Sequence, residues 1–389
     1  MGGKQPIRVG MIGYKFMGKA HSNAYRKVGM FFDPDREVRM SAICGRDEEG
    51  VRQARDKFGW EGYETDWRKL VRRDDIDLID VTTPSDFHKE IAIAAAENGK
   101  HVFCEKPLAL NLADAREILA AVQKAGVRHQ IGFNYRFAPA ILLAKKMIDE
   151  GRLGRIFHFR GMYLQDFVID PSFPLVWRLD KKVAGSGSLG DLGAHVVDLA
   201  RYLVGDLVQV IGHNKTFIKE RPLVEHMTGL SGKASDNAPR GIVDVDDATM
   251  FLGEFDNGAM CTIEATRFAQ GHKNDLSFEI NGEKGSIRFF LPRINELEFF
   301  DATSDAGLQG FATIQVSEEI HPYWSHWWPA AHVIGYEHTF VHEMYEFVQA
   351  IANDRPASPD FEDGMQCSRI LEAVDKSIEE RQWIRLDSM

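Results

Sequence analysis

The sequence has few cysteines, no long apolar run and no excess of positive charge, and each shortage excludes a class of protein. Four cysteines occur in 389 residues, and no two of them form a C-x-x-C pair. This excludes zinc ribbons and small disulfide frameworks and favours a reducing compartment. A membrane-spanning helix needs about 20 consecutive apolar residues, and no stretch of the sequence approaches that length. The start of the chain also lacks an apolar signal-peptide core. We therefore expect a cytoplasmic protein without a membrane partner.

The charge balance argues against a nucleic-acid partner. Acidic residues outnumber basic ones by 58 to 47, which gives a formal net charge of −11. Such a chain is poorly suited to neutralising the phosphates of DNA or RNA. Residues 1–135 are close to neutral, and residues 136–389 carry all of the negative excess. This division favours an anionic ligand held mainly by the first part of the chain.

The first 135 residues alternate between short apolar runs and helical patterns. At about 150 residues per domain, the length predicts two or three domains. Strands are expected at 7–12, 38–44, 78–81, 101–104 and 127–131, and helices at 17–28, 48–58, 88–98 and 112–125. This order predicts an α/β domain, residues 1–135, with a doubly wound parallel sheet of the Rossmann type.

Residues 136–389 predict a different architecture. A helix at 139–150 and a strand at 156–163 precede a loop rich in glycine and serine, 184–188, which opens a helix ending at Tyr202. Residues 208–316 are mostly strand-like, with hairpin turns expected at 256–258 and 281–282. Two helices, 335–353 and 364–382, follow. We predict a C-terminal α+β domain with an open, mostly antiparallel sheet that binds substrate and supports oligomerisation.

The turn after the first strand predicts a dinucleotide site. Its sequence is Gly13-Tyr14-Lys15-Phe16-Met17-Gly18. It keeps the first and third glycines of the G-x-G-x-x-G fingerprint and has lysine at the second. The glycines permit a tight turn and close packing, and the helix N-terminus offers N–H groups to a pyrophosphate. A ligand-free turn explains the broken motif by itself, but its position after the first strand favours NAD or NADP.

The end of the second strand leaves the choice between these cofactors open. It reads Cys44-Gly45-Arg46-Asp47. An acid at the expected position binds the adenosine ribose and favours NAD, whereas a nearby arginine accommodates the phosphate of NADP. Gly45 stands at that position with Arg46 beside it, and Asp47 serves NAD if the register differs by a residue or two.

Lys106 follows the strand at 101–104, in the segment Cys104-Glu105-Lys106-Pro107. Ligands of open α/β sheets bind beyond the carboxyl ends of the strands, where a substrate meets the cofactor. Most lysines are solvated surface charges. A lysine half buried in such a crevice, however, exchanges a proton with a hydroxyl more readily.

Asp191 and His195 lie four residues apart in the segment Gly187-Ser188-Leu189-Gly190-Asp191-Leu192-Gly193-Ala194-His195. On one helix face the carboxylate orients or polarises the imidazole. The alternatives are a helix cap and a core histidine. No third ligand has convincing metal spacing, so no metal is expected. The aromatic segment 321–329 is either a lid, an interface or part of a core.

These segments together resemble the Gfo/Idh/MocA family of oxidoreductases. The likeness rests on the glycine turn, Thr83-Pro84 with His88, Glu105-Lys106-Pro107, Asn134-Tyr135-Arg136, and Asp191 to His195. A closer likeness, to levoglucosan dehydrogenase-type sugar dehydrogenases, rests on Phe16 to Ser22, Tyr163 to Asp166, Trp177-Arg178, Glu220 to Leu223, Val243 to Asp247 and Gly335 to Glu337.

The resemblance implies that the chain uses NAD or NADP to oxidise a secondary hydroxyl of a pyranose, an anhydrosugar or a cyclitol to a ketone, as a homodimer or homotetramer. Lys106, Asp191 and His195 match the family's catalytic residues. Cofactor-binding residues are expected at Gly13, Lys15, Phe16, Met17, Gly18, Gly45, Arg46, Thr83, Pro84, His88, Glu105 and Lys106. Substrate-binding residues are expected at Lys106, Asn134, Tyr135, Gln165, Asp166, Trp177, Arg178, Asp191 and His195.

Two other functions fit the same residues. One is a glycosidase that retains its nicotinamide and cleaves by transient oxidation, and the other is a sensor of sugars or nucleotides without catalysis. The presence of Lys106, Asp191 and His195 together argues against a sensor. In the dehydrogenase, either Lys106 or His195 is the base that takes the hydroxyl proton.

Overall fold

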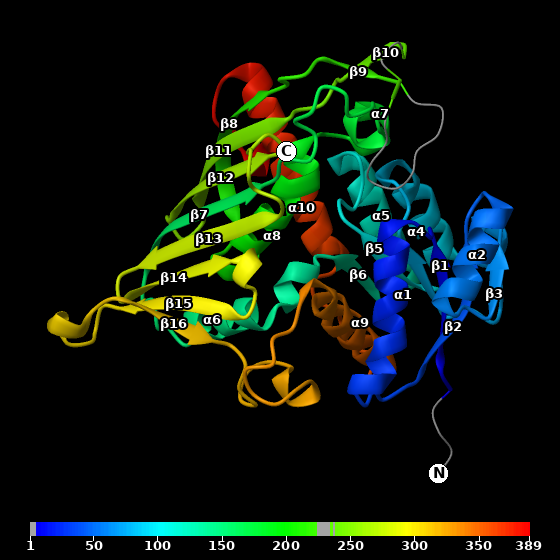
Figure 1. The fold of residues 1–389 in the computed structure, drawn as a ribbon, viewed down its shortest axis with the longest axis horizontal. Helices are drawn as coiled ribbons and strands as arrows, with labels where there is room; N and C mark the ends of the chain where they lie inside the picture. The colour runs from blue at the N-terminus through cyan, green and yellow to red at the C-terminus, as the bar shows by residue number, and fades with distance from the viewer. Residues whose placement is uncertain (1–4, 224–233, 236–237) are drawn as a thin grey trace. The chain divides into compact units, whose positions relative to one another are not determined.

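The chain forms two compact units, drawn in Figure 1. The computed structural model describes residues 5–223, 234–235 and 238–389. One unit comprises Met1–Asn134 with Tyr336–Ser368, and the other comprises Tyr135–Gly335 with Arg369–Met389. The start of the chain, residues 1–4, and part of the expected strand-like region, residues 224–233 and 236–237, lie outside the described residues.

The first unit is built on a six-stranded parallel sheet with the order β3-β2-β1-β4-β5-β6. Its strands are β1 (Ile7–Ile12), β2 (Val38–Cys44), β3 (Gly62–Glu64), β4 (Leu78–Val81), β5 (His101–Glu105) and β6 (His129–Gly132). This is the strand order of a Rossmann sheet, so the predicted doubly wound domain is confirmed. Strand β3 was not predicted, because three half-buried residues at an edge leave no apolar run in the sequence.

The helices of this unit pack as amphipathic elements on the sheet. They are α1 (Phe16–Phe31), α2 (Glu48–Phe58), α3 (Trp67–Leu70), α4 (His88–Glu97) and α5 (Leu112–Ala125). In α5 the buried residues recur at helical spacing, and Gly126 ends the helix in the left-handed conformation with φ of 68°. The Asn111 side chain accepts the backbone N–H of Asp114 and so caps its start. Strong local signals of this kind explain why the predicted bounds agree closely.

Helix α9 (Tyr336–Ala352) belongs to the first unit, which differs from the expected division at residue 135. It lies along α1. Its buried Phe347 has its ring 5.8 Å from that of Phe103 on β5. The apolar face of α9 thus covers a part of the parallel sheet, a long-range contact that position in the sequence does not reveal.

The second unit contains a nine-stranded sheet with the order β16-β15-β14-β13-β7-β12-β11-β8-β17. The strands are β7 (Ile156–Leu164), β8 (Leu207–Lys215), β11 (Ala248–Phe255), β12 (Met260–Thr266), β13 (Asp275–Gly282), β14 (Gly285–Phe290), β15 (Glu296–Asp301), β16 (Phe311–Gln315) and β17 (Ile384–Arg385). Neighbouring strands are antiparallel except for β7 and β12, which are parallel. The expected mostly antiparallel sheet is confirmed. Strands β9 (Glu220–Pro222) and β10 (Arg240–Ile242) pair separately.

The hairpin predicted at 256–258 joins β11 to β12, and Gly258 has φ of 81° as such a turn requires. The turn predicted at 281–282 is wrong by two residues. Asn281 is still paired with Ser286, so the reversal falls at residues 283–284. The Asn-Gly pair is a turn signal, but Asn281 is the last residue of β13 paired with β14, and Gly282 still pairs with Ile156 of β7.

In the aromatic segment 321–329, Trp324 and Trp327 are buried, whereas Trp328 is exposed. Core packing therefore accounts for two of its tryptophans.

Helices α6 (Pro139–Asp149) and α8 (Ala194–Leu203) pack on the nine-stranded sheet. A Cβ on Gly161 of β7 would lie 2.4 Å from Val196 Cγ1, so the glycine allows α8 to approach β7. A buried ion pair anchors α8: Arg136 Nε donates to Asp198 Oδ2 at 2.8 Å, and Nη2 donates to Oδ1. The helix that carries His195 is thus held from both sides.

Replacing Asp198 with asparagine leaves the Arg136 charge buried without its carboxylate. We expect the free energy of unfolding to fall by about 3–5 kcal/mol in urea titrations. Asp206→Asn is the matched control. Asp206 also pairs with an arginine, Arg201 of α8, but the Asp206 side chain is 65% exposed. That change should cost less than about 1 kcal/mol. Equal losses in the two variants would contradict the anchoring role.

Candidate active site

The turn between β1 and α1 has the geometry of a phosphate cradle. Gly13 has φ of 111°, and a Cβ there would lie 2.5 Å from Thr82 Oγ1. A Cβ on Gly18 would lie 2.4 Å from the Gly13 carbonyl oxygen. Within the described helix Phe16–Phe31, no acidic side chain occupies the first turn. The N–H groups and the positive end of the helix dipole therefore meet no competing carboxylate there, and they fit a pyrophosphate.

Three further residues of this turn were predicted to bind the cofactor. Lys15 directly precedes α1, and its Nζ lies 4.7 Å from the centroid of the Tyr14 ring. Phe16 is 46% exposed at the first position of the helix, and Met17 follows it half-buried. Lys15 thus places a cation at the N-terminus of α1.

The end of β2 is occupied by the ring of Tyr14. A Cβ on Gly45 would lie 2.2 Å from Tyr14 Cε1, so only glycine leaves room for the ring. The Tyr14 hydroxyl lies 3.4 Å from Asp47 Oδ2. Burial raises the pKa of Tyr14, and the Asp47 charge raises it further. Arg46 lies over the Phe87 ring, 5.4 Å from its centroid. The Asp47 carboxylate and the Arg46 guanidinium therefore both lie close to Gly45, the position where an acid was expected.

The end of β4 supplies a buried hydroxyl. Thr83 Oγ1 is buried and has no hydrogen-bond partner among the described residues. Buried polar atoms normally have a hydrogen-bond partner. A hydroxyl without one, at the carboxyl edge of a Rossmann sheet, therefore indicates a site that a bound ligand completes. Together with the cradle at Gly13, this hydroxyl shows that the residues present fit a dinucleotide. Pro84, which follows, starts the short turn into α4.

His88 is enclosed between two loops. Its Nε2 lies 3.0 Å from the Thr83 carbonyl oxygen, and its Nδ1 lies 2.9 Å from that of Pro107. Burial lowers the pKa of His88, although the carbonyl contacts oppose the change. The ring therefore ties the end of β4 to the loop after β5 through protein carbonyls.

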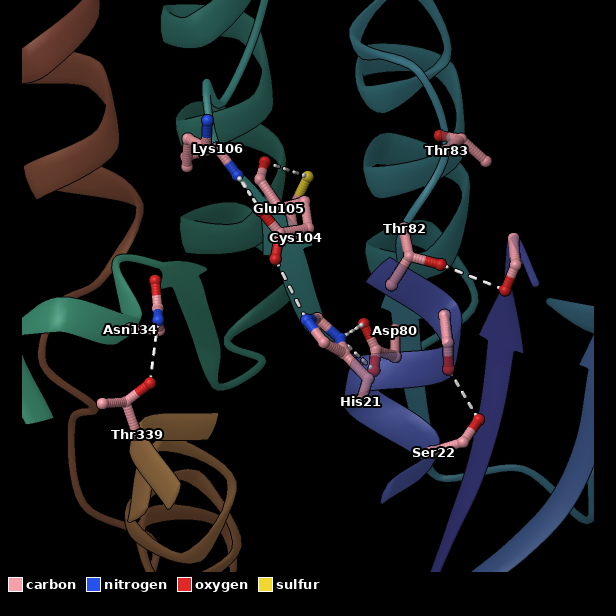
Figure 2. A network of polar contacts seen from close by, with 12 residues as sticks. His21, Ser22, Asp80, Thr82, Thr83, Cys104, Glu105, Lys106, Asn134 and Thr339 are labelled. Carbon is pink, nitrogen blue, oxygen red and sulfur yellow. Dashed lines mark hydrogen bonds and ion pairs between the residues drawn. The ribbon is translucent and has the colours of Figure 1, made fainter. Parts of the chain in front are cut away.

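Lys106 follows β5 directly, and its backbone N–H donates to Glu105 Oε2 at 3.1 Å. The Glu105 side chain is nearly buried, and its Oε1 lies 3.0 Å from His21 Nε2 (Figure 2). The main chain at the predicted catalytic lysine is thus held by a carboxylate that is itself held from α1.

In the second unit, a buried carboxylate organises the segment that carries Asp191. Asp246 accepts the backbone N–H of Gly187 at 2.7 Å and that of Leu189 at 2.9 Å. A Cβ on Gly187 would lie 1.8 Å from the Asp246 carbonyl oxygen, so this position requires glycine. The segment continues as a π-helical turn, Leu189–Gly193, before α8 begins at Ala194.

Asp191 lies between two arginines. Its Oδ2 is 3.2 Å from Arg267 Nη2 and 4.0 Å from Arg178 Nε. Arg267 is fully buried. Burial lowers the pKa of Arg178, the Asp191 charge raises it, and Arg267 lowers it. Arg267 was not among the predicted residues, because one arginine after a strand gives no motif.

His195 lies against a row of uncharged polar groups. Its ring centroid is 4.8 Å from that of Tyr135 and 5.9 Å from that of Tyr163. The hydroxyls of the two tyrosines are 2.9 Å apart. Asn274 Oδ1 accepts both the Tyr163 hydroxyl and Gln165 Nε2 at 2.7 Å. The structure thus brings His195 and Tyr135 together and links them to Gln165 through Tyr163 and Asn274, which sequence reasoning missed as site residues.

The remaining predicted substrate residues have other partners. Asp166 Oδ2 accepts Lys273 Nζ at 2.7 Å and the Gly271 N–H at 3.0 Å, and these bonds lower the pKa of Asp166. The Trp177 ring lies 4.3 Å from Arg178 Cζ. Asn134 belongs to the first unit, where its Nδ2 donates to Thr339 Oγ1 at 2.8 Å (Figure 2).

Among the described residues, no cluster of three or more histidine, cysteine or acidic side chains has the geometry to hold a metal ion. In the same part of the chain, no helix has the length and apolar character needed to cross a membrane.

Comparison with known proteins agrees with this geometry. Residues 7–133 match the model of an oxidoreductase family with an NAD-binding Rossmann fold, and residues 141–288 match the Gfo/Idh/MocA C-terminal domain. The chain belongs to the Gfo/Idh/MocA oxidoreductase family. The resemblance inferred from the motifs is therefore confirmed, as is the NAD-binding character of the first unit.

Individual family members are similar over nearly the whole chain. Levoglucosan dehydrogenase of Pseudarthrobacter phenanthrenivorans is 43% identical, over 98% of this chain and 98% of its own length. A solved structure of levoglucosan dehydrogenase in complex with NADH and levoglucosan is 42% identical, with a TM-score of 0.92 over 98% of this chain and 99% of that one. An oxidoreductase domain protein of Kribbella flavida is 48% identical, with a TM-score of 0.93 over 98% and 100% of the two chains.

Gly18→Ala tests the cradle of this Gfo/Idh/MocA member. The added Cβ meets a backbone oxygen, so α1 must shift, and we expect a stability loss of about 1–3 kcal/mol. NADH affinity, measured by fluorescence titration, should fall by about tenfold. Gly29→Ala in the same helix is the control, because nothing lies within 4 Å of its Cβ position. Gly29→Ala should keep wild-type NADH affinity, and its free energy of unfolding should rise by about 0.5–1 kcal/mol. Unchanged NADH binding in Gly18→Ala would refute the cradle.

Proposed function

We propose that the chain is an NAD(P)-dependent dehydrogenase that oxidises a secondary hydroxyl of a pyranose, an anhydrosugar of the levoglucosan kind or a cyclitol to a ketone. The observation that carries this proposal is a network of hydroxyl and amide groups that starts at Tyr135 and Tyr163 beside His195 and continues through Asn274 to Gln165. Uncharged donors and acceptors next to an imidazole suit a neutral polyol. The similarity to levoglucosan dehydrogenase supports the same substrate class.

The proposed catalytic residues are Lys106, Asp191 and His195. Bound NAD or NADP accepts the hydride from the carbon that bears the hydroxyl. The hydroxyl proton must leave as well, because a protonated carbonyl is an unfavourable product. Either His195 or Lys106 takes that proton, and the other polarises the oxygen. Asp191, ion-paired with Arg267, supplies a fixed carboxylate that orients the imidazole.

The groups proposed to hold the cofactor lie at the ends of three neighbouring strands. The glycine turn and Lys15 receive the pyrophosphate, and Thr83 Oγ1 offers a hydrogen bond. At the end of β2, Asp47 suits the ribose hydroxyls of NAD, whereas Arg46 suits the ribose phosphate of NADP. Kinetics with each cofactor decide between these two.

We also propose the functional division into a cofactor domain, 1–135, and a substrate and oligomerisation domain, 136–389. One face of the nine-stranded sheet exposes Met162, Met250, Leu252 and Met260. Apolar side chains on an open sheet favour a homodimer or a homotetramer. A cytoplasmic location without nucleic-acid or membrane partners fits the negative charge of the chain.

The decisive assay supplies NAD and NADP separately with a panel of pyranoses, anhydrosugars and cyclitols and follows the reduced nicotinamide. Net accumulation of NADH or NADPH supports the dehydrogenase. Release of an aglycone without net reduction supports the glycosidase instead. If every compound is inert with both cofactors, the proposal fails.

Lys106→Met and His195→Asn should each lower kcat by about 10²–10⁴-fold, because each removes a group that moves or stabilises the hydroxyl proton. Turnover of the best substrate at saturating cofactor gives the measurement, and fluorescence titration gives NADH affinity. Lys124→Met, at an exposed position of α5, is the control and should keep wild-type kcat. Activity unchanged in both active-site variants would overturn the assignment.

A further inference from the structure

A fully buried histidine lies between two carboxylates in the first unit (Figure 2). His21 is on α1, and its Nδ1 is 2.9 Å from Asp80 Oδ2 on β4. Its Nε2 is 3.0 Å from Glu105 Oε1 on β5. Carboxylates only accept hydrogen bonds, so both ring nitrogens must donate, and the imidazole is protonated.

The surroundings stabilise this charge. Burial lowers the pKa of His21, but the charges and hydrogen bonds of Asp80 and Glu105 outweigh it and raise the pKa to about 10. The ring centroids of Phe103 and Phe340 lie 5.3 Å and 5.7 Å from that of His21. In this water-excluding environment the ion pairs are screened weakly, so the imidazolium keeps its proton at neutral pH.

Three other titratable groups lie around this network. Burial raises the pKa of Tyr25 on α1, and Asp80 raises it further. Burial also raises the pKa of Cys104 on β5, as does the charge of Glu105. Glu343 of α9 acts on Tyr25 by its charge. The hydroxyl and the thiol are neutral at physiological pH, so His21 is the group that offsets Asp80 and Glu105 in this cluster.

The network joins the three elements that position the cofactor turn and Lys106. His21 lies on the helix that begins at the glycine turn, three residues after Gly18. Glu105 uses its second oxygen, Oε2, to accept the N–H of Lys106. From the other side, a Cβ on Gly132 of β6 would lie 3.1 Å from Glu105 Cδ, so β6 packs closely on the same carboxyl group.

We propose that His21 is a positioning residue for the reaction: by bridging Asp80 and Glu105 it holds Glu105 against the Lys106 backbone and so fixes Lys106 with respect to the glycine turn. This inference rests on the proposed role of Lys106. Without the imidazolium, the buried carboxylates of Asp80 and Glu105 lie on either side of the former ring position with no positive charge between them. Glu105 then turns away or takes up a proton, and the Lys106 main chain loses its restraint.

Three variants test the bridge: His21→Gln, Asp80→Asn and the double variant His21→Gln/Asp80→Asn. We expect His21→Gln to lower kcat/KM by about 10–100-fold at about pH 8, with most of the loss in kcat because Lys106 is misplaced. Its residual activity should rise, relative to wild type, as the pH falls from about 8 to about 6, because a proton bound by the carboxylates replaces the lost one.

The double variant distinguishes a charge bridge from simple packing. Two neutral amides remove the excess negative charge, so kcat/KM should exceed that of His21→Gln by at least about fivefold. Additive losses, with a pH profile parallel to that of wild type, would overturn the proposal. His101→Gln, at the opposite end of β5, is the matched control and should keep wild-type kcat/KM.

Thermal stability against pH gives a readout that needs neither substrate nor cofactor. The pKa of His21 is about 10 in the folded chain and about 6.5 when unfolded. Its stabilisation is therefore fully present below about pH 6.5 and is lost as the pH rises towards about 10. Above about pH 8, where the carboxylates of His21→Gln no longer bind the replacing proton, the Tm of wild type should fall more steeply than that of His21→Gln. Parallel curves would overturn the protonated bridge.

The outcomes also separate this inference from the proposed function. A wild-type chain that folds and binds NADH but oxidises no member of the panel refutes the proposed function, and the pH dependence of Tm then still decides whether His21 is the charged bridge. If His21→Gln does not fold, the double variant carries the kinetic test. Wild-type kcat/KM in a folded His21→Gln chain overturns the positioning role.

Discussion

The close approach of α1 to the carboxyl edge of the parallel sheet is the constraint on which the first unit depends. Gly13 and Gly18 make the approach possible, because a Cβ at either position would collide with neighbouring atoms. The same helix carries His21 to the buried carboxylates of Asp80 and Glu105. One helix thus positions both the phosphate cradle and the Lys106 loop. It does so through backbone contact at Gly13 and Gly18 and, one turn later, through the charge of His21.

In the second unit, a different set of contacts positions Asp191 and His195. Asp246 gathers backbone N–H groups before the π-helical turn, and Gly187 lets the chain pass close to it. Asp191 then meets Arg267, and His195 meets the tyrosines. The Asp191 carboxylate is paired with arginine, whereas the tyrosine rings next to His195 are neutral. That separation is what a neutral substrate with many hydroxyls requires, since each hydroxyl needs a partner but no counter-ion.

Much of the fold could be predicted because its signals are local. Apart from the short elements β3 and α3, the strands and helices of residues 1–135 were predicted within a few residues, since apolar periodicity, Asn111 as a cap and Gly126 as a stop all act within one element. Strand β3, the place of α9 and the exact turn after β13 were not predicted. Each depends on pairing or packing between residues distant in the sequence, which overrides a weak local preference. The roles assigned to the individual site residues stay proposals.

The sequence by itself determined the family, the doubly wound Rossmann domain and the chemical types at Gly13, Lys106, Asp191 and His195, because these occur in short motifs at the ends of strongly patterned elements. Only the tertiary structure decided which side chains accompany them. Arg267 and Asn274 belong to no recognisable local pattern, and the segment Phe16 to Ser22, which contains His21, does not reveal the partners of that histidine. Their partners lie on other elements of the fold, and buried charges and hydrogen bonds act through space, not along the chain.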